Sequence, residues 1–263
     1  MGVSMSPEPR PIKVIIFDVD GTLVTDALHL EKHHHVLTHV FHHPDLRLAE
    51  DEWNEIRGLS DGEAYRYIVQ KARLRGIKGT SLPHEAEYVH RANAFVRANL
   101  HKMKLRDGAF SLLQATQELG LKIGVATNAD WSETYEKLTA VGIQACFSFF
   151  SCLDGVLRPK PFPDLFENAI RQARESHAKL QPTEVLIIED TWTGVTGALQ
   201  TGCRVILWQH PTASIPPHAD FDPKLSHLVI TDQARDVVEV VRKLCRSCML
   251  VNTKFVSIVS DPS

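Results

Sequence analysis

Short runs of apolar, mostly β-branched residues recur along the chain and predict strands. The expected strands are Val14–Phe17, Ile123–Ala126, Val185–Ile188, Val205–Trp208 and His227–Ile230, with Cys146–Phe150 as a weaker sixth. Near-continuous apolar runs of this length are typical of strands covered on both faces, as in parallel sheets. The pattern therefore favours a buried parallel sheet.

Helical spacing of apolar residues separates most of these strands from residue 109 onward. The expected helices are Ala109–Leu119, Ser132–Val141, Pro163–Arg174, Gly194–Thr201 and Ala234–Leu244. Gly120, Gly142 and Gly202 follow or end three of them, and glycine commonly ends a helix. Strands that alternate with helices predict an α/β fold, a Rossmann-like open, mostly parallel sheet with right-handed crossovers.

Residues 25–104 interrupt this alternation because they carry helical patterns and no convincing strand pattern. The expected helices here are Leu28–Val40, Ala49–Ile56, Asp61–Leu74 and His84–Leu100. We therefore expect a first part of the core at 1–24, an inserted α-helical cap domain at 25–104, and a second part of the core at 105–263. An insertion directly after the first strand lies beside the carboxyl edge of the sheet, where it can act as a lid.

Composition and charge narrow the class of protein. The chain has 263 residues, 43% hydrophobic and 23% charged, which is ordinary for a globular protein with a real core. A net charge of -3 lacks the basic signature of nucleic-acid binding, so we expect no nucleic-acid partner. We expect no membrane span, since no apolar run approaches the roughly 18–20 residues required. Five cysteines demand no disulfide, and we expect a cytoplasmic location.

The two ends of the chain leave questions open. The start reads MGVSMSPEPRPIK, which lacks an apolar signal-peptide core and fits either a Pro-rich leader or N-myristoylation of Gly2. Cys245 and Cys248 form a lone C-x-x-C pair, either unrelated thiols or half of a zinc site. The tail Met249–Ser263 has no assigned element.

Polar residues follow three of the expected strands. Asp18-Val19-Asp20-Gly21-Thr22 follows the first, Thr127-Asn128 the second, and Glu189-Asp190 the third. Ligands of open α/β sheets bind outside the carboxyl ends of the strands, so these groups should meet. Four converging carboxylates repel one another, and a hard divalent ion such as Mg2+ would offset them. Lys160, between two prolines in a loop, can supply a further positive charge.

These groups, in this order, resemble the four motifs of the haloacid dehalogenase superfamily of phosphohydrolases, in the branch with a helical cap. FDVDGTLV at 17–24 is similar to the first motif and Thr127 to the second. KPFPDLF, starting at Lys160, is similar to the third, and EDTWTG, starting at Glu189, to the fourth. The resemblance covers roughly residues 12–210 and extends to β-phosphoglucomutase-like and phosphoglycolate phosphatase-like members.

The resemblance implies a role for each site residue. Asp18 would be the nucleophile that forms an aspartyl-phosphate, and Asp20 the general acid and then the base. Asp18, the Asp20 carbonyl and Asp190 would hold Mg2+, with Glu189 as a ligand or a partner through water. The expected phosphate-binding residues are Gly21, Thr127, Asn128 and Lys160. Arg57, in a loop similar to R-G-x-S, would either clamp a second anionic group or lie exposed at a helix end.

Three functions stay open at this point. The leading expectation is a Mg2+-dependent phosphatase of a small phosphorylated metabolite, such as a sugar phosphate, phosphoglycolate or a nucleotide-derived monophosphate. A phosphomutase of the β-phosphoglucomutase type and a non-catalytic binding protein are the alternatives. Asp20 disfavours a dehalogenase, because a halide leaving group needs no proton. We expect a monomer or a weak dimer.

Seven histidines fall within residues 29–43. His29 and His33 are four residues apart, so on a helix they share a face and could bind zinc with a third ligand. The same stretch carries an apolar stripe that includes Leu28, Val36 and Leu37. We therefore expect a polar helix surface that is rich in histidine.

Overall fold

The computed structural model describes residues 11–43, 46, 48–77, 82–209 and 228–246. Its core is a six-stranded parallel sheet in the order β3-β2-β1-β4-β5-β6. The strands are β1 (Val14–Phe17), β2 (Lys122–Ala126), β3 (Phe149–Ser151), β4 (Val185–Glu189), β5 (Arg204–Trp208) and β6 (Leu228–Thr231). This topology confirms the expected Rossmann-like α/β fold.

β1 has the expected bounds, and β2, β4 and β5 are each one residue longer than expected, whereas the two edge strands are displaced. The weak run at Cys146–Phe150 begins as a short 3-10 helix, Gln144–Cys146, and only its end belongs to β3. β6 starts at Leu228, and His227 lies outside the described residues. Both strands are at the edges of the sheet, where apolar patterning is weakest because one side lacks a neighbouring strand.

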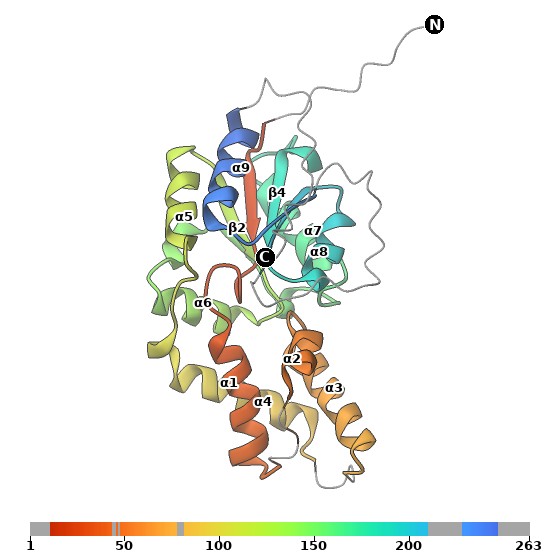
Figure 1. Cartoon of the computed structure of the whole chain (residues 1–263). Helices are drawn as coiled ribbons and strands as arrows, with labels where there is room; N and C mark the ends of the chain where they lie inside the picture. Colours follow the sequence, from red (N-terminus) through yellow and green to blue (C-terminus); the bar gives the residue numbers. More distant parts are fainter. Residues whose placement is uncertain (1–10, 44–45, 47, 78–81, 210–227, 247–263) are drawn as a thin grey trace, which may run out of the picture.

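Helices cover both faces of the sheet (Figure 1). α5 (Ala109–Glu118) and α9 (Ala234–Arg246) pack on one face, and α7 (Asp164–Arg174) and α8 (Trp192–Leu199) on the other. Successive strand residues point to opposite faces, so Ile15 of β1 joins the first cluster and Ile16 the second. All four residues of β1 are buried, which explains the unbroken apolar run.

The cap forms a third hydrophobic cluster of its own. Its helices are α1 (Ala27–His35), which continues as a π-helical turn (Val36–Val40), α2 (Glu50–Ile56), α3 (Asp61–Leu74) and α4 (Glu85–Ala98). Trp53, Ile68 and Tyr88 are buried at its centre. Figure 1 shows α1 to α4 grouped beyond one end of the sheet. The domain limits at 24/25 and 104/105 stay predictions.

The two segments that connect cap and core lie side by side. Thr25 N donates to Lys104 O at 2.9 Å, and Arg106 N donates to Leu23 O at 2.9 Å. Val24 and Leu105 form an antiparallel bridge between these bonds. Because these two backbone connections pair with each other, the chain enters and leaves the cap at the same point.

Several sequence features fall outside the described residues, namely Gly2 with its myristoylation motif, Cys248 and the tail Met249–Ser263. The described cysteines, Cys146, Cys152, Cys203 and Cys245, are all free. Among the described helices, none is long and apolar enough to cross a membrane.

Candidate active site

The carboxyl ends of β1, β2 and β4 deliver the predicted site residues to one edge. Phe17 pairs with Val125 on one side and Ile188 on the other, so the residues that follow these strands are neighbours. The Asp18 N–H donates to Ile188 O at 3.0 Å, which continues the ladder by one residue. The sheet register therefore brings Asp18, Thr127 and Glu189 together, as the sequence predicted.

Lys160 lies at the centre of this edge and is 2% exposed. Its Nζ is 2.6 Å from Asp18 Oδ1, 2.5 Å from Glu189 Oε1 and 2.8 Å from the carbonyl oxygen of Ala126. Burial disfavours the ammonium ion, but Asp18 and Glu189 together raise the pKa of Lys160 above its usual value. The lysine therefore stays charged and offsets part of the carboxylate charge.

Asp18, Glu189 and Asp190 form a candidate metal site, with one oxygen of each within 4.8 Å of the others. Burial raises the pKa of Asp18 to about 7, although Lys160 opposes this shift. Burial, together with Asp18 and Glu189, raises the pKa of Asp190 well above its usual value. A divalent cation among these oxygens would remove the cost of ionising them.

The chemistry of this donor set fits a hard cation such as Mg2+. All three ligand groups are carboxylates, and Asp190 Oδ2 is buried with no hydrogen-bond partner among the described residues. Asp190 Oδ1 accepts a hydrogen bond from Thr22 Oγ1 at 3.2 Å, which orients the group. Gly21 has a φ of +87°, and a Cβ there would collide with the Asp190 carboxylate. The loop after β1 thus leaves room at Asp190 Oδ2.

Glu189 is held by more contacts than the other carboxylates. One oxygen binds Lys160, and Oε2 accepts from Asp190 N, Thr191 N and Thr191 Oγ1 at 3.1–3.3 Å. With both oxygens engaged, Glu189 is better suited to fixing Lys160 and reaching a metal through water than to direct ligation. This favours the second of its two expected roles.

Asp20 is held by a lysine that the sequence analysis missed. Lys137 Nζ lies 2.8 Å from Asp20 Oδ1, 2.7 Å from Oδ2, and 2.6 Å from Glu133 Oε1. Lys137 and Glu133 belong to α6 (Trp131–Ala140) and are both buried. Burial opposes ionisation of Glu133, but Lys137 and Lys32 lower its pKa to about 2. The available signal was a Glu–Lys pair four residues apart on the helix after Thr127.

Thr127 and Asn128 make contacts within the protein. Thr127 Oγ1 accepts from Ala129 N at 3.2 Å. Asn128 Nδ2 donates to the carbonyl oxygen of Gly58 at 2.8 Å, and Asn128 Oδ1 accepts from Lys160 N at 2.9 Å. The Asn128 side chain therefore joins the cap to the Lys160 loop, and its expected contact with phosphate stays a prediction.

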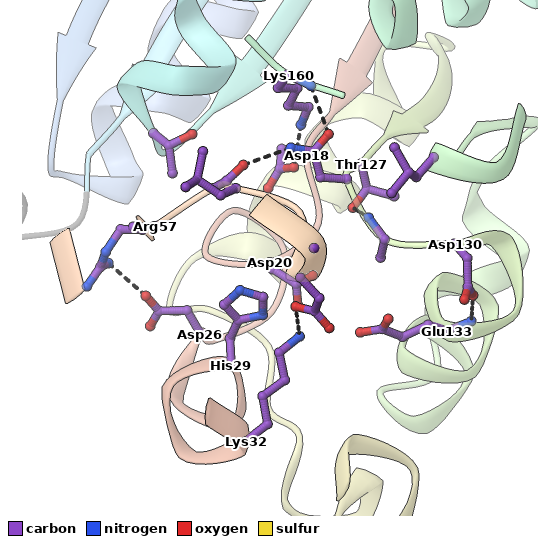
Figure 2. Close-up of a pocket in the computed structure, with 18 of the residues that line it drawn as sticks. Asp18, Asp20, Asp26, His29, Lys32, Arg57, Thr127, Asp130, Glu133 and Lys160 are labelled. Carbon is purple, nitrogen blue, oxygen red and sulfur yellow. Dashed lines mark hydrogen bonds and ion pairs between the residues drawn. The ribbon is translucent and has the colours of Figure 1, made fainter. Parts of the chain in front are cut away.

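A cavity of about 120 Å³ lies between cap and core and reaches Asp18, Thr127, Lys160 and Asp190. Figure 2 shows Asp26, His29, Lys32 and Arg57 of the cap on the side opposite Lys160. Arg57 Nη1 is 2.7 Å from Asp26 Oδ2, so its guanidinium already has an anionic partner. The Arg57 side chain is 9% exposed and so does not lie exposed at a helix end; its contact with a second anion of the substrate stays a prediction, with which this ion pair would compete.

The histidine-rich segment is not a uniform polar surface. His33 is fully buried with Nδ1 2.5 Å from Tyr88 Oη, because α1 packs on α4, so the surface interpretation is wrong there. His39 and His42 are exposed, as expected. His29, His33 and Asp61 lie close enough to hold a metal, but Lys32 Nζ is 2.6 Å from Asp61 and supplies that carboxylate with its cation.

A family model described as "haloacid dehalogenase-like hydrolase" matches residues 15–208, which is most of the chain. The chain belongs to the haloacid dehalogenase-like hydrolase family. The family assignment confirms the resemblance and the expected enzyme class, a hydrolase. The matched range begins inside β1 and ends at the last residue of β5, so it contains all four motifs and the cap.

Proteins similar to this chain include YhcW of Bacillus subtilis, which is named as a phosphatase. It is 26% identical over 218 residues, covering 82% of this chain and 92% of that protein. The crystal structure of CbbY from Rhodobacter sphaeroides in complex with phosphate superposes with a TM-score of 0.68. The two chains are 22% identical, and 86% of this chain and 96% of CbbY are covered. A β-phosphoglucomutase from Clostridium difficile has a TM-score of 0.61 at 18% identity, covering 74% of this chain and 83% of the other. The two structures establish the fold.

Proposed function

We propose that this protein is a Mg2+-dependent phosphatase that hydrolyses a small phosphate monoester through an aspartyl-phosphate on Asp18. The observation that carries the proposal is the buried contact of Asp18 with Lys160, beside the orphaned oxygen of Asp190. An acidic nucleophile, a fixed ammonium ion and an oxygen-only metal site together suit phosphoryl transfer, where positioning and charge neutralisation supply most of the catalysis. The phosphatase name of a relative that covers most of the chain supports the same activity.

The reaction has two steps, transfer of the phosphoryl group to Asp18 and hydrolysis of the aspartyl-phosphate. Lys160 holds Asp18 Oδ1, which leaves Oδ2 to attack phosphorus. The new bond from Asp18 to phosphorus forms as the bond to the alcohol oxygen breaks, and Asp20 gives its proton to that oxygen. Asp20 then takes a proton from water, which attacks phosphorus and releases phosphate with Asp18 restored.

In this proposal Lys137 controls when Asp20 can donate its proton. Because Lys137 Nζ contacts both oxygens of Asp20, at least one of these oxygens must leave the lysine before it can carry and donate a proton. Glu133 keeps the ammonium ion paired when this happens, so the exchange leaves no unpaired buried charge. In this proposal α6 supplies a positioning residue for the acid.

Mg2+, when bound, would be held by Asp18, Asp190 and the backbone carbonyl of Asp20, with Glu189 reached through water, and would neutralise charge on the phosphoryl group. Thr127 and Lys160 would hold phosphoryl oxygens, as would the backbone near Gly21 and Asn128. The phosphorylated substrate is then the expected binding partner of this protein. We still expect the protein to be a monomer or a weak dimer in the cytoplasm.

The test is a panel of phosphate monoesters with Mg2+, in which free phosphate and isomerised phosphate are both measured. We expect release of free phosphate, loss of release in EDTA and its recovery when Mg2+ is returned. Isomerised product without net phosphate release would instead identify a phosphomutase. Asp18→Asn should abolish release, while Asp107→Asn, at an exposed position before α5, should not. Equal activity of Asp18→Asn and the wild type would exclude the proposed nucleophile.

A further inference from the structure

The cap end of the cavity, away from Lys160, carries polar groups that chemistry at phosphorus does not use. Its lining there includes Asp26, His29, Trp53, Arg57 and Asn93. Figure 2 shows the Arg57 guanidinium and the Asp26 carboxylate turned toward each other, with the His29 ring beside Asp26. With phosphorus at Asp18, these side chains would surround the alcohol that leaves. Their charge and hydrogen-bonding capacity therefore select the substrate.

The cations at this end of the cavity already have carboxylate partners. Arg57 pairs with Asp26 at 2.7 Å, and Lys32 pairs with Asp61 at 2.6 Å. Among the described residues that line the whole cavity, carboxylates outnumber cations by seven to three. A second phosphate or carboxylate on the substrate would compete with Asp26 for Arg57 and with Asp61 for Lys32, and a half-buried carboxylate that lost this contest would lose its counter-charge, which is unfavourable. The cap end therefore opposes a second anion.

Two residues that line the cavity, His29 and Asn93, each carry an unused hydrogen-bonding atom. His29 Nδ1 and Asn93 Oδ1 are buried and have no hydrogen-bond partner among the described residues. Burial, reinforced by Lys32, holds the pKa of His29 well below its usual value, so its ring is neutral. A neutral imidazole both donates and accepts, whereas the Asn93 oxygen only accepts. A hydroxyl group can satisfy either atom, and a purely apolar group can satisfy neither.

We propose that the cap end selects an uncharged, hydroxyl-rich alcohol. The substrate is then the monophosphate of a sugar or polyol, and not a bisphosphate or a phosphorylated acid. Trp53, with its ring centroid 5.7 Å from that of His29, adds an apolar wall against which carbon-bound hydrogens of such an alcohol can pack. This inference rests on the proposed phosphatase activity and adds to it the class of the leaving alcohol.

Matched pairs of monoesters test this selection on the full chain with saturating Mg2+. Sorbitol 6-phosphate is compared with 6-phosphogluconate, and glycerol 3-phosphate with 3-phosphoglycerate, because the members of each pair differ only by a carboxylate in place of a hydroxymethyl group. Propyl phosphate is the hydroxyl-free reference. We expect kcat/KM to be at least tenfold higher for the neutral member of each pair than for its acid. Glycerol 3-phosphate should likewise exceed propyl phosphate by at least tenfold.

Equal or better turnover of the acids, or of propyl phosphate, overturns the inference. p-Nitrophenyl phosphate separates this failure from failure of the proposed function. If it is hydrolysed while the acids are preferred, only the substrate class is wrong. If no monoester is hydrolysed, the proposed phosphatase activity is wrong, and the inferred substrate class is then wrong as well.

Two variants test whether the named groups make the selection. Asp26→Asn frees the Arg57 guanidinium, so the acid of each pair should gain at least tenfold in kcat/KM relative to the neutral member. Asn93→Leu should lower the preference for glycerol 3-phosphate over propyl phosphate at least fivefold. His90→Gln, at an exposed position of α4, is the control and should leave both ratios unchanged. Unchanged ratios in Asp26→Asn and Asn93→Leu would refute the assignment.

Discussion

The raised pKa of Asp18 makes a prediction about stability that does not depend on catalysis. In the folded protein without metal the pKa of Asp18 is about 7, against 3.8 for an unperturbed aspartate. Between these values the folded state binds more protons at Asp18 than the unfolded state does. Stability therefore falls as pH rises from about 4 to 7, because the unfolded chain ionises this group freely and the folded chain must ionise it in a buried, acidic site.

The size of the effect follows from the shift. One pKa unit corresponds to about 1.4 kcal/mol, so a rise of this size amounts to roughly 4 kcal/mol lost between pH 4 and pH 8. For a chain of this length that is on the order of 10 °C in Tm. Mg2+ at this site should restore most of the loss at pH 8 and little at pH 5.

Thermal unfolding of the wild type and Asp18→Asn at pH 4.5 and pH 8, each in EDTA and in Mg2+, measures this linkage. In EDTA we expect Asp18→Asn to exceed the wild type in Tm by several degrees at pH 8 and to match it at pH 4.5. Mg2+ should raise the Tm of the wild type at pH 8 and have a much smaller effect on Asp18→Asn. A difference between the two proteins that is the same at both pH values would refute the reasoning, as would equal stabilisation of both by Mg2+.

Three further substitutions probe the metal site, the cap and the acid. Gly21→Ala would push a methyl group into the Asp190 carboxylate, so Mg2+ binding measured by calorimetry should weaken at least tenfold. The control is Gly120→Ala, which is also at positive φ but has nothing within 4 Å of the added Cβ, and it should bind Mg2+ normally. Gly58→Ala would place its Cβ 2.7 Å from Thr191 Oγ1 and hold the cap away from the core, so KM should rise several-fold, and an unchanged KM would contradict this contact. Lys137→Met should lower kcat by about 10²-fold and alter the pH–rate profile, since Asp20 loses its positioning partner; a profile identical to that of the wild type would argue against that role.

Buried β-branched runs and four ordered motifs were enough to predict the sheet, the helices that follow its first strand, and the residues that meet at its carboxyl edge. The meeting of Asp18, Glu189 and Asp190 could be predicted because each lies at the carboxyl end of an apolar run typical of a buried parallel strand, and such ends share one edge. Lys160 could be predicted because its loop sits among prolines between two such strands. These inferences need only local sequence, since strand ends in one sheet necessarily share an edge.

Tertiary packing decided the rest. Lys137 looks in sequence like an ordinary lysine of an amphipathic helix, and only the placement of α6 against the loop after β1 turns it toward Asp20. Arg57 contacts Asp26, and His33 contacts Tyr88, although the residues of each pair are far apart in the sequence. No helical or strand periodicity predicts such contacts. A sequence pattern reports which face of an element is apolar, whereas the partner of a buried charge depends on how elements cross. The convergence of Asp18, Lys160 and Asp190 at the carboxyl edge could therefore be predicted from the sequence, whereas the charge pairing at the cap end depends on how the helices pack.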